Sequence, residues 1–335
     1  MTIRERQEAL EEKILSPYAT LSSRSKGRAV PEPPDEIRPV FQRDRDRILH
    51  SKSLRRLKHK TQVFFRPKGD HYRTRLTHTL EVSQISRTIA VALNMNESLT
   101  EAIALGHDLG HTPFGHSGEA ALDAICSFGF KHAEQSVRIV ELLEKDGKGL
   151  NLTYEVRDGI RNHSLSTMPS TPEGKIVRLS DKIAYINHDI DDAIRGHLIT
   201  EEDIPLHLRE TMGMDNRERL DTLVNAVIYP SLDKGDVIMD PVIYEAMLDM
   251  RNFMFDNVYI NRIAKAEEKK AQDLVAKLFE HFMKHPEEMS EEFRKLLDRG
   301  ETRERVVCDY VAGMTDQYAI DIFRDIFLPT AWSIY

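Results

Sequence analysis

Residues 76–119 read LTHTLEVSQISRTIAVALNMNESLTEAIALGHDLGHTPFGHSGE, and this stretch decides the fold class. Its apolar residues favour two consecutive helices, at 76–93 and 99–109, separated by the turn-forming residues 94–96. Thr112 and Pro113 then interrupt the helical pattern. The stretch therefore predicts an all-α fold.

The helical pattern continues on both sides of this stretch. Further helices are expected at residues 2–15, 44–60, 118–127, 133–145, 156–163 and 175–194, with several more after residue 204. The exception is 63–72, where the turn-like residues 67–70 predict a small β-hairpin. No solenoid repeat, glycine-rich P-loop or Rossmann fingerprint is found in the sequence.

The expected organisation has three parts. Residues 1–39 are expected to form an N-terminal helix and a linker arm containing several Ser and Pro residues. Residues 40–200 would form the helical core. Residues 201–335 would form a C-terminal helical region that packs on this core and takes part in oligomer contacts.

The composition restricts the class of protein. A chain of 335 residues, 40% of them hydrophobic, can bury a large core. Its two cysteines, Cys126 and Cys308, cannot provide a disulfide framework or a cysteine-based zinc site, which favours a reducing, cytoplasmic location. No signal-peptide pattern and no run of about 18 uncharged apolar residues occurs. A soluble protein without membrane association is expected.

The charge is distributed unevenly. The net charge is -8, yet residues 38–75 hold 13 Lys and Arg against three acids, a local balance of +10 that leaves -18 for the rest. Such a segment is either a solvated helical face or a binding surface for a phosphate-rich ligand. A regulatory nucleotide and single-stranded nucleic acid are further ligands that a basic segment can bind.

Histidines and aspartates suggest a metal site. Three elements stand out, each on its own predicted helix: His78, the adjacent pair His107 and Asp108, and Asp181. Two imidazoles and two carboxylates suit a transition metal or Zn²⁺ better than Ca²⁺. Adjacent side chains on a helix diverge by about 100°, so the pair can share an ion only near the helix edge. Each histidine taken alone is more readily explained as a hydrogen-bonded core residue.

The order of these residues resembles the HD superfamily of metal-dependent phosphohydrolases, in which a histidine, a His-Asp pair and a distant aspartate follow one another on helices. The runs at 44–50, 60–64, 73–78, 107–119 and 311–316 resemble more closely the deoxynucleoside triphosphate triphosphohydrolases, the dGTPase-like branch. The resemblance covers residues 44–316. It implies that residues 40–200 are an HD-domain core with a C-terminal helical extension.

The resemblance implies hydrolysis of dGTP, or of deoxynucleoside triphosphates generally, to a deoxynucleoside and inorganic triphosphate. It implies one divalent ion per site (Mn, Mg, Fe, Co, Ni or Zn), bound by His78, His107, Asp108 and Asp181. A departing 5′-oxygen needs a proton, and the resemblance gives this role to His116, oriented by Glu119 three residues later. It also implies that His111 faces the substrate phosphates.

A substrate pocket follows from the same resemblance, formed by Gln62, Arg75, Lys182, Tyr185, Asp189 and His132, with His163 as a further member. Arg75 and Lys182 would contact the phosphates. Gln62 and Asp189 would bind the 3′-hydroxyl, and the Tyr185 ring would leave no space for a 2′-hydroxyl. The other histidines of the region are interpreted as structural or surface residues: His50, His59, His188 and His197.

Alternatives remain at this stage. The chain could be another HD phosphohydrolase acting on nucleotides, but such an enzyme should lack the His116 and Glu119 pair. It could also be a nucleotide- or nucleic-acid-binding regulator without turnover, which the intact ligand set disfavours. The resemblance further implies a homo-oligomer with nucleotide-regulated activity. No motif specifies the preferred base, the resident metal or the number of subunits.

Overall fold

The computed structural model describes residues 1–62, 73–164, 166–259 and 262–329. Within these ranges the chain forms helices, turns and loops, and the β pairing consists of isolated antiparallel bridges, Arg28 with Thr153 and Thr61 with Thr74. The predicted all-α fold is therefore confirmed for the described residues. The hairpin predicted at 63–72 lies outside them.

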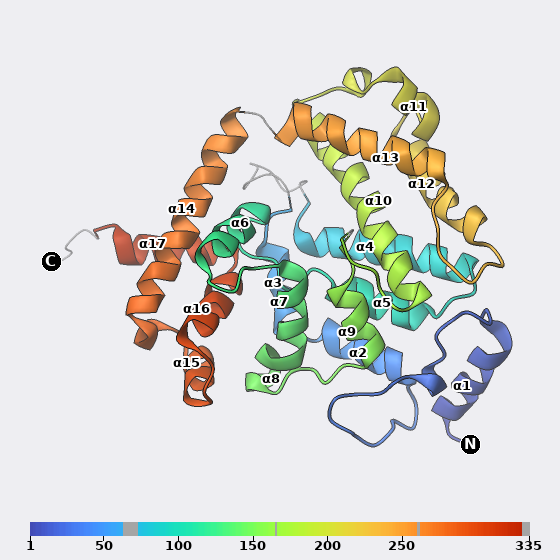
Figure 1. The fold of residues 1–335 in the computed structure, drawn as a ribbon, viewed down its shortest axis with the longest axis horizontal. Helices are drawn as coiled ribbons and strands as arrows, with labels where there is room; N and C mark the ends of the chain where they lie inside the picture. Colours follow the sequence, from blue (N-terminus) through green and yellow to red (C-terminus); the bar gives the residue numbers. More distant parts are fainter. Residues whose placement is uncertain (63–72, 165, 260–261, 330–335) are drawn as a thin grey trace, which may run out of the picture.

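The framework of the fold consists of three helices that pack against one another: α4 (Arg75–Ala92), α5 (Glu97–Gly106) and α10 (Pro172–Arg195) (Figure 1). Each is preceded by a residue whose side chain accepts a hydrogen bond from a first-turn N–H group, respectively Thr74, Asn96 and Thr171. All three helices were predicted from the sequence. The second is shorter than expected, because regular helix ends at Gly106.

The single helix predicted at 44–60 is wrong. The chain instead forms three short elements: α2 (Val40–Leu49), α3 (Lys52–Arg56) and the 3₁₀ turn η2 (Leu57–His59). The break falls at Ser51, whose hydroxyl accepts a hydrogen bond of 3.1 Å from the backbone N–H of Leu54. A serine in this position starts a new helix, and this local signal outweighs the apolar spacing.

The larger of two hydrophobic clusters fills the space between the framework helices. Ile89 on α4, Leu99 on α5 and Ile183 on α10 are fully buried in it. The cluster continues into α2 and four more helices: α9 (Tyr154–Arg161), α11 (Leu206–Met212), α12 (Asn216–Ser231) and α13 (Pro241–Met254). Because apolar burial extends along α10, that helix is a firm support for its polar residues.

The smaller cluster joins α6 to the C-terminal helices, which Figure 1 places on the side away from α12 and α13. These elements are α6 (His116–Ile125), α14 (Arg262–Lys284), α15 (Glu291–Asp298), α16 (Arg303–Ala312) and α17 (Asp316–Phe327). Leu122, Val275 and Val307 are fully buried there, and Cys126 and Cys308 are buried free thiols of the same cluster. The three-part division of the chain stays a prediction.

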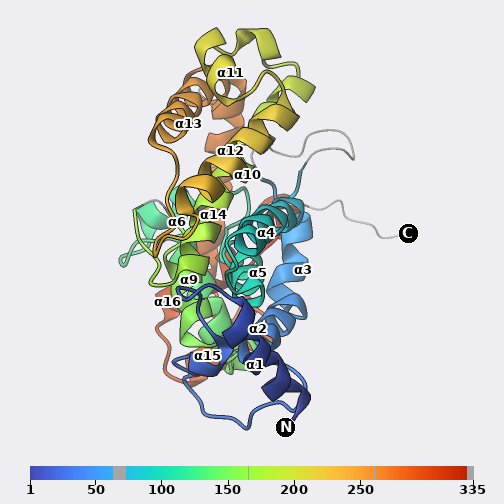
Figure 2. The same cartoon turned by 90° about the vertical axis from the view of Figure 1, so that its right-hand side faces the viewer.

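Shorter elements complete the fold: α1 (Ile3–Ile14), η1 (Ser22–Arg24), α7 (His132–Arg138), η3 (Ile139–Leu143), α8 (Glu144–Gly147), η4 (Glu201–Asp203), η5 (Phe255–Tyr259) and η6 (Pro286–Glu288). The predicted helix at 133–145 corresponds to α7 and the π-helical turn η3. Seen from the side, α1 and α2 lie at one end of the molecule and α11 at the other (Figure 2). No helix in the described ranges is long and apolar enough to cross a bilayer.

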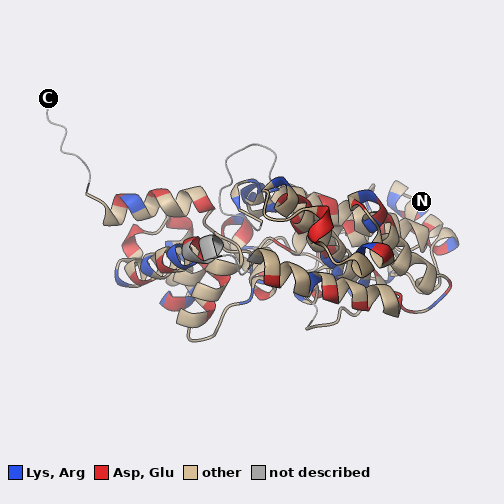
Figure 3. Cartoon of the chain, turned by 90° about the horizontal axis from the view of Figure 1, so that it is seen from above, with Lys and Arg blue, Asp and Glu red and all other residues tan. Residues whose placement is uncertain are grey.

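Several cations of the basic segment at 38–75 pair with neighbouring carboxylates. Arg38 pairs with Asp46 at 2.9 Å, and Arg47 pairs with Glu32 at 2.6 Å. Figure 3 accordingly shows both signs of charge interspersed over the helices. Part of the local excess therefore belongs to the fold, and among the described residues of this segment Arg75 is the cation that lines the cavity described below.

The N-terminal arm, residues 16–39, is held against the core by buried carboxylates. Thr20 donates from its backbone N–H and its hydroxyl to Glu173 on α10, at 2.9 and 2.8 Å. The backbone N–H of Lys26 donates to Glu155 on α9 at 2.7 Å. Glu173 is completely buried, and its burial raises the pKa of the carboxyl above 4.5, although the hydrogen bonds from Thr20 oppose this shift.

We expect the substitution Glu173→Gln to change the pH dependence of stability. The folded protein binds a proton at Glu173 more tightly than the unfolded chain does, so this group's contribution to stability is lost as the pH rises above 4.5. The variant loses an acceptor and should be less stable by about 1–3 kcal/mol at pH 4.5, with a smaller gap at pH 7.5. Urea unfolding at both pH values measures the gap. A gap that does not change with pH would contradict the raised pKa.

Candidate active site

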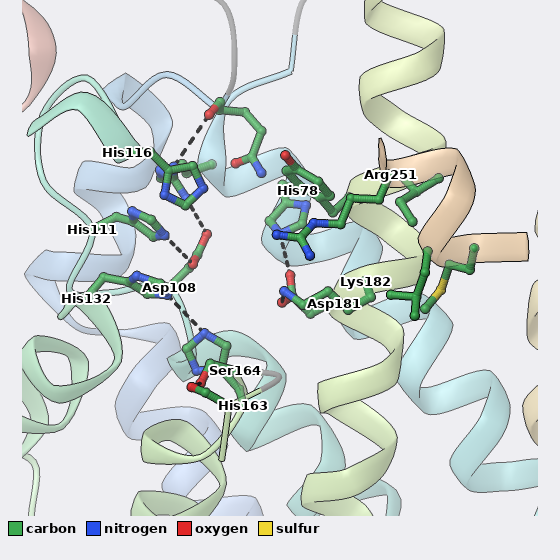
Figure 4. A pocket seen from close by; sticks show the side chains of 17 residues that line it. His78, Asp108, His111, His116, His132, His163, Ser164, Asp181, Lys182 and Arg251 are labelled. Atoms are coloured by element: carbon green, nitrogen blue, oxygen red, sulfur yellow. Dashed lines mark hydrogen bonds and ion pairs between the residues drawn. The ribbon is translucent and has the colours of Figure 1, made fainter. Parts of the chain in front are cut away.

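A cavity of about 330 Å³ lies between α4, α10, α13 and the start of α6. Its lining includes nearly all of the residues proposed from the sequence as site residues (Figure 4). Those in the lining are Gln62, Arg75, His78, Asp108, His111, His116, His132, His163, Asp181, Lys182 and Tyr185. His107, Glu119 and Asp189 lie behind this lining. The structure therefore brings residues from distant parts of the chain into one site.

The four predicted metal ligands lie within reach of one another. His78 Nε2 is 3.3 Å from Asp181 Oδ1, and His107 Nε2 is 3.8 Å from the same oxygen and 3.6 Å from Asp108 Oδ1. Ligand atoms of His78, His107 and Asp108 all lie within 4.8 Å of one another. The expectation that this pair lies on a helix is wrong, since residues 107–110 form turns after α5. These turns allow both side chains to face the same point.

The chemistry of these donors fits a divalent cation. His107 Nδ1 donates to the Ala104 carbonyl at 2.6 Å, so Nε2 carries the free lone pair of the ring. This nitrogen is buried and has no hydrogen-bond partner among the described residues. Burial lowers the pKa of His107, so the ring is neutral. The imidazoles of His78 and His107 beside two carboxylates form a mixed nitrogen and oxygen set that suits a divalent transition metal or Zn²⁺.

Each carboxylate of the set has a cationic neighbour. Arg75 Nη1 donates to Asp108 Oδ2 at 2.9 Å, and Lys182 Nζ donates to Asp181 Oδ2 at 2.9 Å. Burial opposes ionisation of both acids, but the neighbouring positive groups outweigh it and hold the pKa of Asp108 and of Asp181 well below the usual range. Both acids are therefore charged at neutral pH.

Glu119 contacts His132 more closely than it contacts His116. The expected contact with His116 Nδ1 is present at 3.4 Å, but His132 Nδ1 lies 2.9 and 3.0 Å from the two carboxylate oxygens, and the backbone N–H of His132 also donates at 2.9 Å. Burial opposes the charge on Glu119, but the hydrogen bonds from both rings hold its pKa well below the usual range. His116, with 69% of its side chain exposed, is free to face a ligand.

His132 is engaged at both ring nitrogens. Its Nδ1 contacts the ionised Glu119, and its Nε2 lies 3.2 Å from His163 Nε2. His163 Nδ1 donates to the Ile160 carbonyl at 2.7 Å. Burial lowers the pKa of His163 to about 3, which keeps that ring neutral. The ring of His132 is therefore held between Glu119 and His163.

A second cluster of potential ligands is better explained as part of this network. Ligand atoms of Asp108, His111 and His132 also lie within 4.8 Å of one another. However, both His132 nitrogens are engaged, and its ring stacks on His111 with centroids 3.9 Å apart and planes at 15°. Stacked rings direct their lone pairs in parallel, so they converge poorly on one ion. The geometry supports one metal site in the described cavity.

The structure also places His188 and two residues for which sugar contacts were predicted, Gln62 and Asp189. Gln62, at the cavity wall, has a buried side-chain oxygen with no hydrogen-bond partner among the described residues. Asp189 is buried one helical turn after Tyr185 on α10. His188 is not on the surface: it is buried, its Nε2 lies 3.1 Å from Glu81, and its ring contacts His78 with centroids 5.8 Å apart. It supports the site from behind.

Sequence reasoning missed part of the cavity wall. Met247 and Leu248 on α13 form an apolar wall, Ser164 and Ser166 form another edge, and Arg251 extends from α13 toward the site (Figure 4). Arg251 is exposed, and its guanidinium has no hydrogen-bond or ion-pair partner among the described residues. No motif marks this arginine, since it follows the His-Asp residues by more than 60 positions and only the packing of α13 on α10 brings it close.

Comparisons with known proteins agree with this geometry. Residues 75–186 match the family model of the HD domain, and residues 237–325 match that of the phosphohydrolase-associated domain. Several curated relatives carry the name deoxyguanosinetriphosphate triphosphohydrolase-like protein. The relative from Caldanaerobacter subterraneus subsp. tengcongensis is 58% identical over 99% of this chain and 98% of its own length. Those from Clostridium perfringens and Desulfatibacillum aliphaticivorans are 50% and 46% identical, each over 98% of this chain and 98% or 99% of their own lengths.

We expect His107→Ala to weaken binding of a divalent metal by at least about tenfold. The substitution removes the unpartnered nitrogen and leaves Asp108 and Asp181 facing each other. Metal content after dialysis, measured by elemental analysis, is the readout and needs no assay of activity. His207→Ala, at an exposed position on α11, is the control and should retain wild-type metal content. Equal metal content in both variants would contradict this assignment of the ligand.

Proposed function

The chain belongs to the HD-domain phosphohydrolases of the deoxyguanosinetriphosphate triphosphohydrolase-like family, and on this premise we propose that it hydrolyses deoxynucleoside triphosphates to a deoxynucleoside and inorganic triphosphate. The observation that carries the proposal is the arrangement of charges around the cavity. A buried set of metal-binding side chains lies beside three cations, Arg75, Lys182 and Arg251. A triphosphate with about four negative charges complements such a surface.

The proposed metal ligands are His78, His107, Asp108 and Asp181. When bound there, a divalent cation supplies Lewis-acid stabilisation of the charge that develops on the reacting phosphate. Arg75 and Lys182 already donate to the two ligand carboxylates, and each has further N–H groups to offer to phosphate oxygens. Arg251, without a partner of its own, is proposed to bind the far end of the triphosphate.

His116 is the proposed general acid. In the proposed reaction water attacks the α-phosphorus, the bond to the 5′-oxygen breaks, and His116 delivers a proton to that oxygen. Glu119 accepts from His116 Nδ1 and so turns the opposite nitrogen toward the cavity. His132, held in place by Glu119, and the stacked His111 would lie against the phosphates. This arrangement extends the expected dyad of His116 and Glu119 to a third residue.

Selection of the sugar is assigned to three residues. No described residue donates a hydrogen bond to the buried side-chain oxygen of Gln62, and a 3′-hydroxyl could donate one. Tyr185 also lines the cavity and would exclude a 2′-hydroxyl by its size. Asp189, one turn further along α10, is proposed to bind the same 3′-hydroxyl. Preference for dGTP, self-assembly and regulation by nucleotide or single-stranded nucleic acid stay predictions.

Incubation with each deoxynucleoside triphosphate and a divalent metal should release inorganic triphosphate, identified by ion chromatography. His116→Ala should lower kcat by about 100-fold or more while metal content stays that of the wild type, because only the proton donor is lost. Release of phosphate or pyrophosphate instead would indicate another HD phosphohydrolase. Binding of nucleotide without any product would indicate a regulator without turnover.

Arg251→Ala should raise KM for the triphosphate by about 10-fold or more, since a charge-assisted hydrogen bond is worth roughly 1.5–3 kcal/mol. Arg251→Lys keeps the charge and should recover part of the loss. Arg217→Ala, an exposed arginine on the neighbouring α12, serves as the matched control and should leave KM unchanged. The steady-state rate as a function of substrate concentration gives the comparison. An unchanged KM in Arg251→Ala would remove this residue from the binding site.

A further inference from the structure

Two sequence runs that the proposed chemistry leaves mostly unexplained meet in space. Residues 60–62 precede the segment outside the described ranges, and residues 312–316 connect α16 to α17. We call residues 312–316 the α16–α17 corner. Apart from Gln62, neither run contributes a side chain to the cavity lining. Their contacts instead lead to the loop at 111–115, which directly precedes His116.

Asp316 holds two of the segments that carry site residues. Its Oδ1 accepts a hydrogen bond of 3.0 Å from the backbone N–H of Phe114, two residues before His116. Its Oδ2 accepts from the backbone N–H of Thr61 at 3.0 Å and from the Thr61 hydroxyl. Thr61 is next to Gln62 in the chain. One buried carboxylate thus fixes the position of two backbone segments at the cavity wall.

Lys60 makes the reciprocal connection. Its ammonium is buried and donates to the backbone carbonyl of His111 and, at 3.0 Å, to that of Ala312 at the end of α16. The backbone carbonyl of Lys60 accepts from the N–H of Arg75 at 3.1 Å. The corner and the site-bearing segments are therefore joined from both sides by buried polar contacts, which are costly to break.

The loop that these contacts hold has an unfavourable backbone conformation. Phe114 has φ 61° and Gly115 has φ 57°, so two consecutive residues are left-handed immediately before α6. A non-glycine residue in this region costs of order 1–3 kcal/mol and persists only where its surroundings impose it. For Phe114 the surroundings are Asp316 at its N–H and the smaller hydrophobic cluster around its ring. At Gly115 an added Cβ would lie 2.9 Å from Arg75 Nη2.

We propose that the α16–α17 corner positions the active site, with Asp316 and Lys60 as positioning residues that hold His116 and Gln62 in their working geometry. The proposal rests on the proposed triphosphohydrolase function. Neither residue touches substrate; they act through the backbone of residues 60–62 and 111–115. The C-terminal helices α14 to α17 thereby help to position the site, although none of their described side chains lines the cavity.

The test uses the full-length, metal-loaded chain and the substitution Asp316→Ala. Misplacement of His116 by about 1 Å should lower kcat by about 10- to 100-fold. Metal content should stay that of the wild type, since the ligands lie on other segments. Asp316→Asn keeps one acceptor oxygen and should lose less activity, which provides a second variant if the alanine protein folds poorly. Hydrogen–deuterium exchange of the Phe114 amide should be at least about tenfold faster in Asp316→Ala.

Asp309→Asn is the matched control. Asp309 is a fully buried carboxylate of α16 that accepts from Gln135 and Arg138 on α7, so it joins α16 to α7 without touching the loop before His116. We expect a lower Tm, a kcat per folded molecule within about twofold of wild type, and unchanged exchange at Phe114.

The positioning role of Asp316 and the proposed triphosphohydrolase function can fail separately. A wild-type kcat in Asp316→Ala, or equal losses of kcat in Asp316→Ala and Asp309→Asn, overturns the positioning role. If the wild-type chain releases no triphosphate from any deoxynucleoside triphosphate, the proposed function fails. In that case the exchange rate of the Phe114 amide still tests whether Asp316 holds the loop at 111–115. Faster exchange in Asp316→Ala but not in Asp309→Asn supports this role, and unchanged exchange in Asp316→Ala overturns it.

Discussion

The architecture depends on the burial of two carboxylates beside two imidazoles in the interior of the protein. Asp108 and Asp181 remain charged there because Arg75 and Lys182 donate to one oxygen of each, while their other oxygens face the unpartnered nitrogen of His107. Burial of a charge without such compensation is strongly unfavourable. The positions of α4, the end of α5 and α10 relative to one another can therefore vary only slightly.

The framework of the fold could be predicted because periodicity and capping agree in its helices. Thr74, Asn96 and Thr171 each cap a helix whose apolar spacing is regular, so local and long-range signals coincide. The prediction failed where they conflict. Ser51 starts a new helix inside an otherwise regular pattern, and Gly106 ends α5 before the His-Asp pair. The spacing of apolar residues alone does not predict where a capping residue or a turn ends a helix.

The candidate site was predictable where a motif keeps its residues together in the chain. His116 and Glu119 follow at helical spacing, and their contact is present. The closer contact of Glu119 with His132 depends on how α7 packs, and spacing gives no sign of it. Arg251 and the wall of α13 depend on a helix far along the chain. Short sequence motifs therefore predict contacts between residues that are close in the chain. The parts of the cavity wall that α7 and α13 contribute depend on tertiary packing.

The docking of the N-terminal arm has a consequence for the order of folding. Thr20 is separated from its partner Glu173 by 153 residues, and Val30 from its partner Asn151 by 121. Contacts of such long sequence separation form late, because a long loop must close before they contribute. During synthesis from the N-terminus, the arm leaves the ribosome well before α9 and α10 exist. A segment made early is therefore among the last to reach its native place, and until then the buried acids that receive it face water.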